Sequence, residues 1–119
     1  MSKTTLVLGA SANPSRYSNI AVQKLVRYSH AVIAFGTREG LIGNIAITKT
    51  WPTKDVDTVT LYIGPDRQQE YYSAIIALRP RRIIFNPGTE NPAFYKLLGK
   101  TEIEFEKACT LVMLGAGTY

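Results

Sequence analysis

The chain has 119 residues, of which 45% are hydrophobic and 19% are charged, and 14 Lys and Arg against 9 Asp and Glu give a net charge of +5. This length predicts one domain over residues 1–119, and this composition excludes an intrinsically disordered chain. The lone cysteine, Cys109, excludes an internal disulfide and favours a reducing, cytoplasmic location. We see no signal peptide and no run of about 20 apolar residues, so we expect no membrane association.

The first predicted strand covers residues 4–8 and ends at Gly9 in a small, polar segment. A helix follows over residues 18–28, because apolar side chains recur there at three- and four-residue spacing. These side chains are Ile20, Ala21, Val22, Leu25 and Val26. The remaining elements alternate in the same way: strand 31–35, a short irregular strand within 40–49, strand 58–63, helix 66–78, strand 82–85, a helix after Asn91 and Pro92, edge strand 103–105, and an apolar segment 111–114.

Continuous apolar strands that alternate with helices are typical of a parallel sheet covered on both faces. We therefore predict the α/β class, as a Rossmann-like three-layer sandwich with a mostly parallel sheet of about five strands. Ligands of such sheets bind beyond the carboxyl ends of the strands. Four segments rich in small and polar residues follow predicted strands, at 9–18, 36–40, 64–68 and 86–91.

A strand, a small-residue turn and a helix start together present unpaired N–H groups to an anion. Gly9 permits the tight turn, and Ala10 and Ser11 let a phosphate approach the main chain. Arg16 adds a charge-assisted hydrogen bond, and hydroxyls such as that of Ser18 add further donors. An ordinary strand-to-helix connection is the alternative.

The glycine fingerprint of dinucleotide-binding proteins is incomplete here, since only Gly9 matches and the later positions are Ser11 and Pro14. The second strand is followed by Gly36, Thr37 and Arg38, with no acidic residue at the position that holds the ribose of NAD. Arg38 favours an additional phosphate, as in NADP or coenzyme A (CoA). A solvated loop cation is the alternative for Arg38.

Four segments of the chain match the pattern of one known family. They are Gly9-Ala10-Ser11 with residues 13–18; Tyr62-Ile63-Gly64-Pro65; Asn86-Pro87-Gly88-Thr89-Glu90-Asn91; and Cys109, which precedes the C-terminal apolar segment. On these segments the chain resembles the stand-alone CoA-binding domain family, whose fold is similar to that of the CoA-binding domain of succinyl-CoA synthetase. It departs from that family after the second strand, where Phe35-Gly36-Thr37 replaces a proline-bearing turn.

The resemblance implies coenzyme A as the cofactor and assigns residues to its parts. The pyrophosphate site is then lined by Gly9, Ser11, Asn13, Pro14, Arg16 and Tyr17. The adenosine end lies near Gly36, Thr37 and Arg38, and the adenine is covered by Ile63, Gly64 and Pro65. The remaining expected ligand contacts are Ala10, Ser18, Asn86, Pro87 and Gly88.

Catalytic machinery is not evident in the sequence. His30 lies at the sheet edge opposite the predicted site. We expect Cys109 to be a packed apolar residue and Glu90 to cap the following helix. The function predicted is CoA or acyl-CoA binding, and we expect a binding module rather than an enzyme. The alternatives are a small NADP-binding oxidoreductase or redox sensor, and a regulatory subunit with a vestigial nucleotide pocket.

The basic residues do not predict a nucleic-acid partner. Arg79, Arg81 and Arg82 form the one cluster, and it falls between a helix and a strand, where cations complement a helix C-terminus. A homodimer or an unknown protein partner is compatible with the seven tyrosines, because tyrosine is enriched at interfaces.

Overall fold

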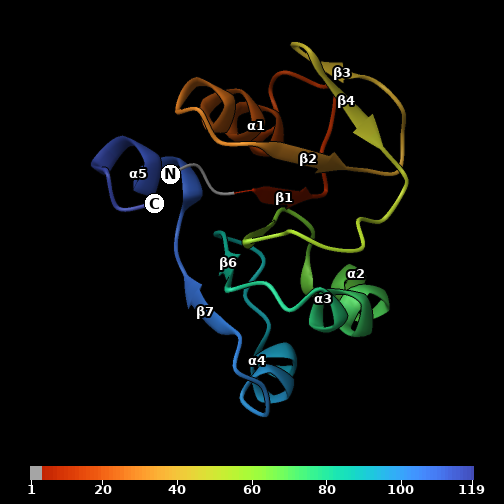
Figure 1. Cartoon of the computed structure of the whole chain (residues 1–119), viewed down its shortest axis with the longest axis vertical. Coiled ribbons are helices and arrows are strands. Elements are labelled where there is room, and N and C mark those ends of the chain that lie inside the picture. Colours follow the sequence, from red (N-terminus) through yellow and green to blue (C-terminus); the bar gives the residue numbers. More distant parts are fainter. Residues whose placement is uncertain (1–3) are drawn as a thin grey trace.

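A seven-stranded sheet forms the centre of the molecule in the computed structural model, which describes residues 4–119 (Figure 1). Its strands are β1 (Thr5–Leu8), β2 (Val32–Phe35), β3 (Leu41–Ile42), β4 (Ile45–Thr48), β5 (Thr58–Leu61), β6 (Arg82–Phe85) and β7 (Glu104–Lys107). The helices are α1 (Tyr17–Arg27), α2 (Pro65–Gln68), the 3₁₀ turn η1 (Gln69–Tyr71), α3 (Tyr72–Leu78), α4 (Pro92–Leu98) and α5 (Thr110–Ala116).

The strand order is β3-β4-β2-β1-β5-β6-β7, and every neighbouring pair is parallel except β3 with β4. The predicted α/β class with a mostly parallel sheet is confirmed. The sheet has seven strands rather than about five, because residues 41–48 form a two-stranded hairpin rather than one irregular strand and the predicted edge strand is present as β7. The antiparallel pairing of the hairpin needs only a short turn, which Gly43 makes at a positive φ of 59°.

Alternate residues of each strand enter two separate cores, because successive side chains point to opposite faces of a sheet. On β1, Leu6 and Leu8 join a core with Ile75 of α3 and Phe94 of α4. Val7 points the other way, into a core that includes Val22 of α1 and Leu114 of α5. Helices α1 and α5 therefore cover one face of the sheet, and α2 to α4 cover the other.

The helix predicted over residues 66–78 is wrong as a single helix, since the segment is divided into α2, η1 and α3. Tyr71, where η1 meets α3, departs from helical geometry, with a φ of −104° and a ψ of −3°. Gln68 ends α2 with a fully buried side chain, and its amide donates to the carbonyl oxygens of Ile63 and Thr89 at 3.0 and 2.7 Å. Gly64 is the N-cap of α2 and Pro65 begins the helix, one residue before the predicted start at residue 66.

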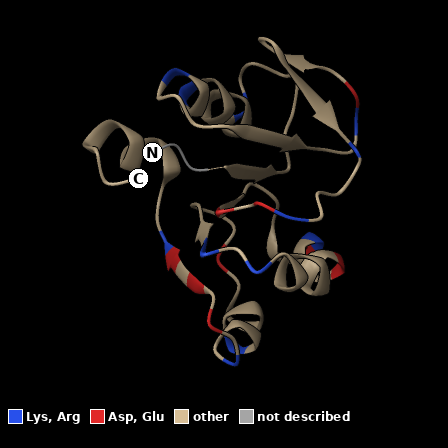
Figure 2. Cartoon of the chain, in the orientation of Figure 1, with Lys and Arg blue, Asp and Glu red and all other residues tan. Residues whose placement is uncertain are grey.

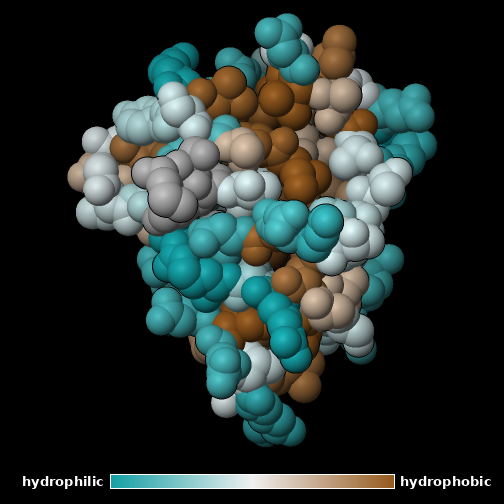
Figure 3. All heavy atoms as spheres, viewed as in Figure 1, coloured by the Kyte–Doolittle hydropathy of each residue, from teal (hydrophilic) through white to brown (hydrophobic). Residues whose placement is uncertain are grey.

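The predicted apolar stripe of the first helix is only partly buried. Ala21, Val22 and Leu25 are inaccessible to solvent, whereas Ile20 and Val26 are 38% and 45% exposed. Hydrophobic side chains also reach the surface in the upper half of Figure 3, where α1 and strands β2 to β4 lie. No helix within residues 4–119 is long and apolar enough to span a membrane.

The three clustered arginines occupy separate structural positions rather than one basic patch, and charged residues of both signs are spread over the molecule (Figure 2). Arg79 ends α3 in the left-handed conformation. Arg81 forms an ion pair with Asp57 at 3.1 Å. Arg82 is buried, donates to Thr58 Oγ1 at 3.0 Å, and lies 4.4 Å from the ring centre of Tyr119.

Candidate functional site

A cleft of about 910 Å³ opens at the carboxyl ends of β1, β2, β5 and β6. The chain leaves β1 toward α1 on one face of the sheet and leaves β5 toward α2 on the other. This change of face separates the loops and creates the crevice in which α/β sheets bind ligands. The lining comes from residues 8–13, 15–18, 35–39, 62–64, 67, 71 and 87–89.

The predicted ligand residues line this cleft, with the exceptions of Pro14, Pro65 and Asn86. Pro14 and Pro65 are exposed outside it. Asn86 is 2% exposed and is directed into the fold. Its amide donates to Thr60 Oγ1 and to the Leu61 carbonyl at 2.7 and 2.8 Å, and its Oδ1 accepts from the Thr110 N–H at 2.9 Å.

Two glycines allow the cleft loops to approach one another closely. Gly9 has a φ of +102°, and a Cβ there would lie 2.8 Å from Cγ2 of Ile63. A Cβ on Gly36 would lie 2.5 Å from the carbonyl oxygen of Ala10. The loops after β1, β2 and β5 thus pack backbone to backbone, and larger residues at these two positions would separate them.

Not all of the backbone donors that the sequence indicated are free to meet an anion. The N–H groups of Gly9 and Ala10 both donate to the carbonyl oxygen of Phe35, at 3.0 and 2.9 Å, so they are already paired. Helix α1 instead leaves donors available, because its N-cap residue, Arg16, makes no capping hydrogen bond with its side chain. The N–H groups of Tyr17 and Ser18 have no acceptor within residues 4–119.

Asn13 gives the first loop its shape. Its side-chain oxygen accepts from the N–H and the hydroxyl of Ser15 at 3.0 and 2.8 Å, and its N–H donates to the Ser11 hydroxyl at 3.1 Å. These short-range bonds turn the chain from β1 into α1. The Asn13 carbonyl then accepts from the N–H of Arg16 at 3.0 Å, which fixes the start of the helix.

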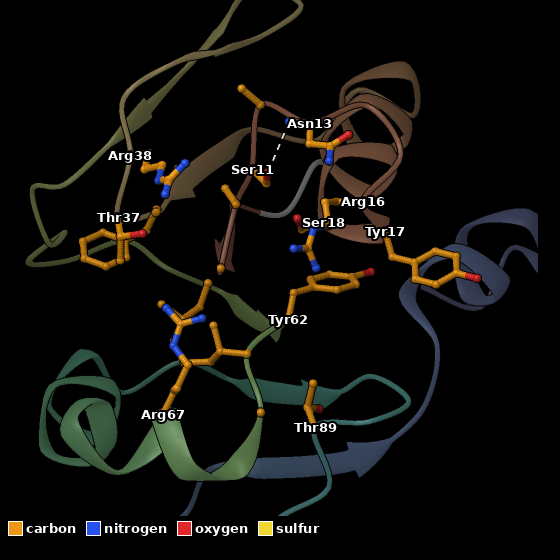
Figure 4. A pocket seen from close by; sticks show the side chains of 18 of the residues that line it. Ser11, Asn13, Arg16, Tyr17, Ser18, Thr37, Arg38, Tyr62, Arg67 and Thr89 are labelled. Atoms are coloured by element: carbon orange, nitrogen blue, oxygen red, sulfur yellow. Dashed lines mark hydrogen bonds between the residues drawn. The ribbon is translucent and has the colours of Figure 1, made fainter.

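The cleft carries more positive than negative charge, and its arginines are unpaired within the described residues. Arg16, Arg38 and Arg67 line it, and Glu39 is the one acidic side chain among the lining residues. None of the three guanidinium groups has a hydrogen bond or ion pair to another described residue. In Figure 4, Arg16 extends from α1 above Tyr62, whereas Arg38 and Arg67 lie on the same side of the cleft, on its two walls. Such a site attracts a ligand with several negative charges.

Comparison with known proteins agrees with this geometry. A family model described as the CoA binding domain matches residues 3–115. The chain belongs to the CoA-binding domain family. The family resemblance stated from the sequence is therefore confirmed.

Several solved structures have similar folds. One uncharacterized protein is 42% identical, with a TM-score of 0.96 over 100% of this chain and 99% of that chain. A Thermus thermophilus protein is 23% identical, with a TM-score of 0.82 over 99% and 91%. A hypothetical protein from Pyrococcus horikoshii OT3 is 22% identical, with a TM-score of 0.79 over 96% and 82%. The last two show a common fold alone, and no curated protein matches the chain.

Sequence reasoning missed several lining residues of this CoA-binding domain, above all Tyr62, Arg67 and Tyr71. Tyr62 was assigned to the strand, but β5 ends at Leu61 and the ring of Tyr62 reaches the cleft. Burial raises the pKa of its hydroxyl above the usual value. Arg67 lies on α2 and Tyr71 ends η1, and both line the cleft although the sequence analysis assigns neither a ligand role.

Groups considered for catalysis take other positions in this CoA-binding domain. The ring of His30 lies 5.0 Å from that of Tyr119, at the amino-terminal side of β2 and away from the cleft. Glu90 accepts from the N–H of Gly88 at 2.8 Å, whereas Asn91 caps α4. The prediction that Glu90 caps this helix is therefore wrong. Within residues 4–119 no group of three His, Cys, Asp or Glu is placed to hold a metal ion.

Proposed function

We propose that this protein binds coenzyme A or an acyl-CoA in the cleft at the carboxyl edge of its sheet, as a binding module rather than an enzyme. The uncompensated charge of Arg16, Arg38 and Arg67 carries the proposal, and family membership supports it. CoA combines a diphosphate, a 3′-phosphate and a nucleobase, which suits a cleft with separate cationic positions. A cytoplasmic location, where CoA is available, belongs to the same proposal.

Arg16 and the start of α1 would bind the diphosphate. The helix offers the free N–H groups of Tyr17 and Ser18 and the positive end of its dipole, and Arg16 adds a full charge beside them. Gly9 and Ala10 would shape this position rather than donate to it, because their N–H groups are already paired. The Ser11 hydroxyl retains its proton for a ligand, since it accepts in its one bond within the loop.

The first experiment is native mass spectrometry of the purified protein with CoA, NADP and NAD. A CoA adduct formed in preference to the other two supports the proposal. Selective binding of NADP would favour the oxidoreductase alternative, since Arg38 also suits a 2′-phosphate. Binding of none of the three would contradict CoA binding and favour the vestigial-pocket alternative.

Arg16→Ala tests the role of the first loop by isothermal titration calorimetry. We expect the affinity for CoA to fall about tenfold, the usual effect of removing a charge-assisted hydrogen bond. The melting temperature should stay nearly unchanged, because the Arg16 side chain is exposed and has no partner among residues 4–119. Arg27→Ala, at the far end of the same helix, is the matched control. Equal affinities of the Arg16 variant and the wild type would exclude this residue from the site.

A further inference from the structure

Arg67 is a cation of the cleft that the family resemblance did not assign. It belongs to α2, directly after β5, and it lines the cleft together with Arg38 from the loop after β2. The two side chains approach one side of the opening from opposite walls (Figure 4). The cleft therefore has a second cationic position, apart from Arg16 on α1.

The charge of Arg67 is not used within the fold. Its guanidinium forms no hydrogen bond or ion pair with any described residue, although Asp66 and Glu70 lie close to it in sequence. Its field does reach the neighbouring Tyr71. Burial and Glu70 raise the pKa of the Tyr71 hydroxyl, and the positive charge of Arg67 opposes them. Arg67 and Tyr71 thus face the cleft together.

A rigid aromatic wall adjoins this second cationic position. Tyr71 stacks on Trp51 with ring centres 5.5 Å apart and planes at 19°. Trp51 in turn meets the ring of Phe35 edge-on at 5.0 Å. Because Phe35 and Tyr71 both line the cleft, a flat ring bound there would meet aromatic surface beside two arginines.

This combination matches the nucleoside end of CoA, in which a ribose carries the 3′-phosphate next to adenine. We infer that Arg67, together with Arg38, binds the 3′-phosphate and sets the preference for CoA over dephospho-CoA. Arg67 is then a specificity-determining residue of the proposed CoA site, and the inference rests on that proposed function. Two guanidinium groups from opposite walls surround a phosphate better than one, since each offers a planar fork of donors.

The test compares CoA with dephospho-CoA by calorimetry on the wild type and on Arg67→Gln. We expect the variant to lose about tenfold in CoA affinity while its affinity for dephospho-CoA changes less than about twofold. Arg67→Lys retains the charge without the fork, so it should keep part of the preference. Lys100→Gln removes one charge from the exposed turn after α4 and should affect neither ligand.

The outcomes separate this inference from the function on which it rests. Wild type that binds neither nucleotide overturns both. Wild type that binds CoA while Arg67→Gln loses the same factor for CoA and dephospho-CoA overturns only the role of Arg67 at the 3′-phosphate. Unchanged CoA affinity in Arg67→Gln overturns it equally, and leaves the CoA site standing.

Discussion

At the scale of single residues, Asn86 shows how an expected ligand contact can serve the fold. Its amide joins the ends of β5 and β6 to the first residue of α5 through Thr60, Leu61 and Thr110. All polar atoms of the side chain are used inside the protein. The next two residues of the Asn-Pro-Gly segment, Pro87 and Gly88, line the cleft, whereas the Asn86 side chain holds the segment to the sheet.

Replacement of Asn86 by alanine should destabilise the protein. The change leaves the buried Thr110 N–H and Leu61 carbonyl without this partner, and we expect a loss of roughly 3 kcal/mol in the free energy of unfolding. Urea denaturation followed by circular dichroism measures it. Asn44→Ala, in the exposed turn between β3 and β4, is the control and should change stability by less than about 0.5 kcal/mol. Equal stabilities of the two variants would show that the Asn86 bonds are dispensable.

At the scale of elements, the cleft depends on how closely the loops after the strands pack. Gly36→Ala places a Cβ 2.5 Å from the carbonyl oxygen of Ala10, a main-chain atom that can move only with its loop. We expect this variant to unfold with about 1–3 kcal/mol less free energy. Gly64→Ala is the control, because no atom lies within 4 Å of its added Cβ and its φ is −68°. If the two variants were equally stable in urea, the loops would not be held in close contact.

The same elements show what the sequence could predict. Strands such as β1 are evident because both faces of a parallel sheet are buried, which leaves continuous apolar runs such as Leu6 to Leu8. The cleft loops could be located in the sequence because each of them directly follows a predicted strand. The division of residues 65–78 into α2, η1 and α3 does not follow from the apolar spacing, and neither does the bond from Gln68 to Thr89, a residue distant in sequence. Arg67 falls within the predicted ligand-edge segment 64–68, but nothing in the sequence pattern distinguishes its side chain as a ligand contact.

The sequence also does not show which backbone N–H groups of a loop are already hydrogen-bonded within the fold. Gly9 and Ala10 were expected at the phosphate, and both do line the cleft, yet their N–H groups are paired with Phe35. Residue type and spacing indicate which loop meets a ligand. The neighbouring strand determines which N–H groups of that loop remain free, so the folded structure is needed to identify them.

At the scale of the whole molecule, charge rather than shape should govern how strongly the ligand is attracted. The chain has a net charge of +5, and three of its arginines converge on one cleft. Charged residues of both signs are spread over the rest of the molecule (Figure 2). The arginines of the cleft therefore add a local attraction to the net positive charge that an approaching polyanion meets.

Salt should accordingly weaken CoA binding, because the Debye length falls from about 30 Å at 0.01 M to about 8 Å at 0.15 M ionic strength. Between these conditions we expect the Kd for CoA, measured by calorimetry, to rise several-fold. The rise should be smaller for dephospho-CoA, which carries less charge, and smaller for Arg16→Ala, which attracts less. A Kd independent of ionic strength would contradict this prediction. It would mean that the aromatic wall of Phe35 and Tyr71, and not the charge of the three arginines, supplies the affinity for CoA.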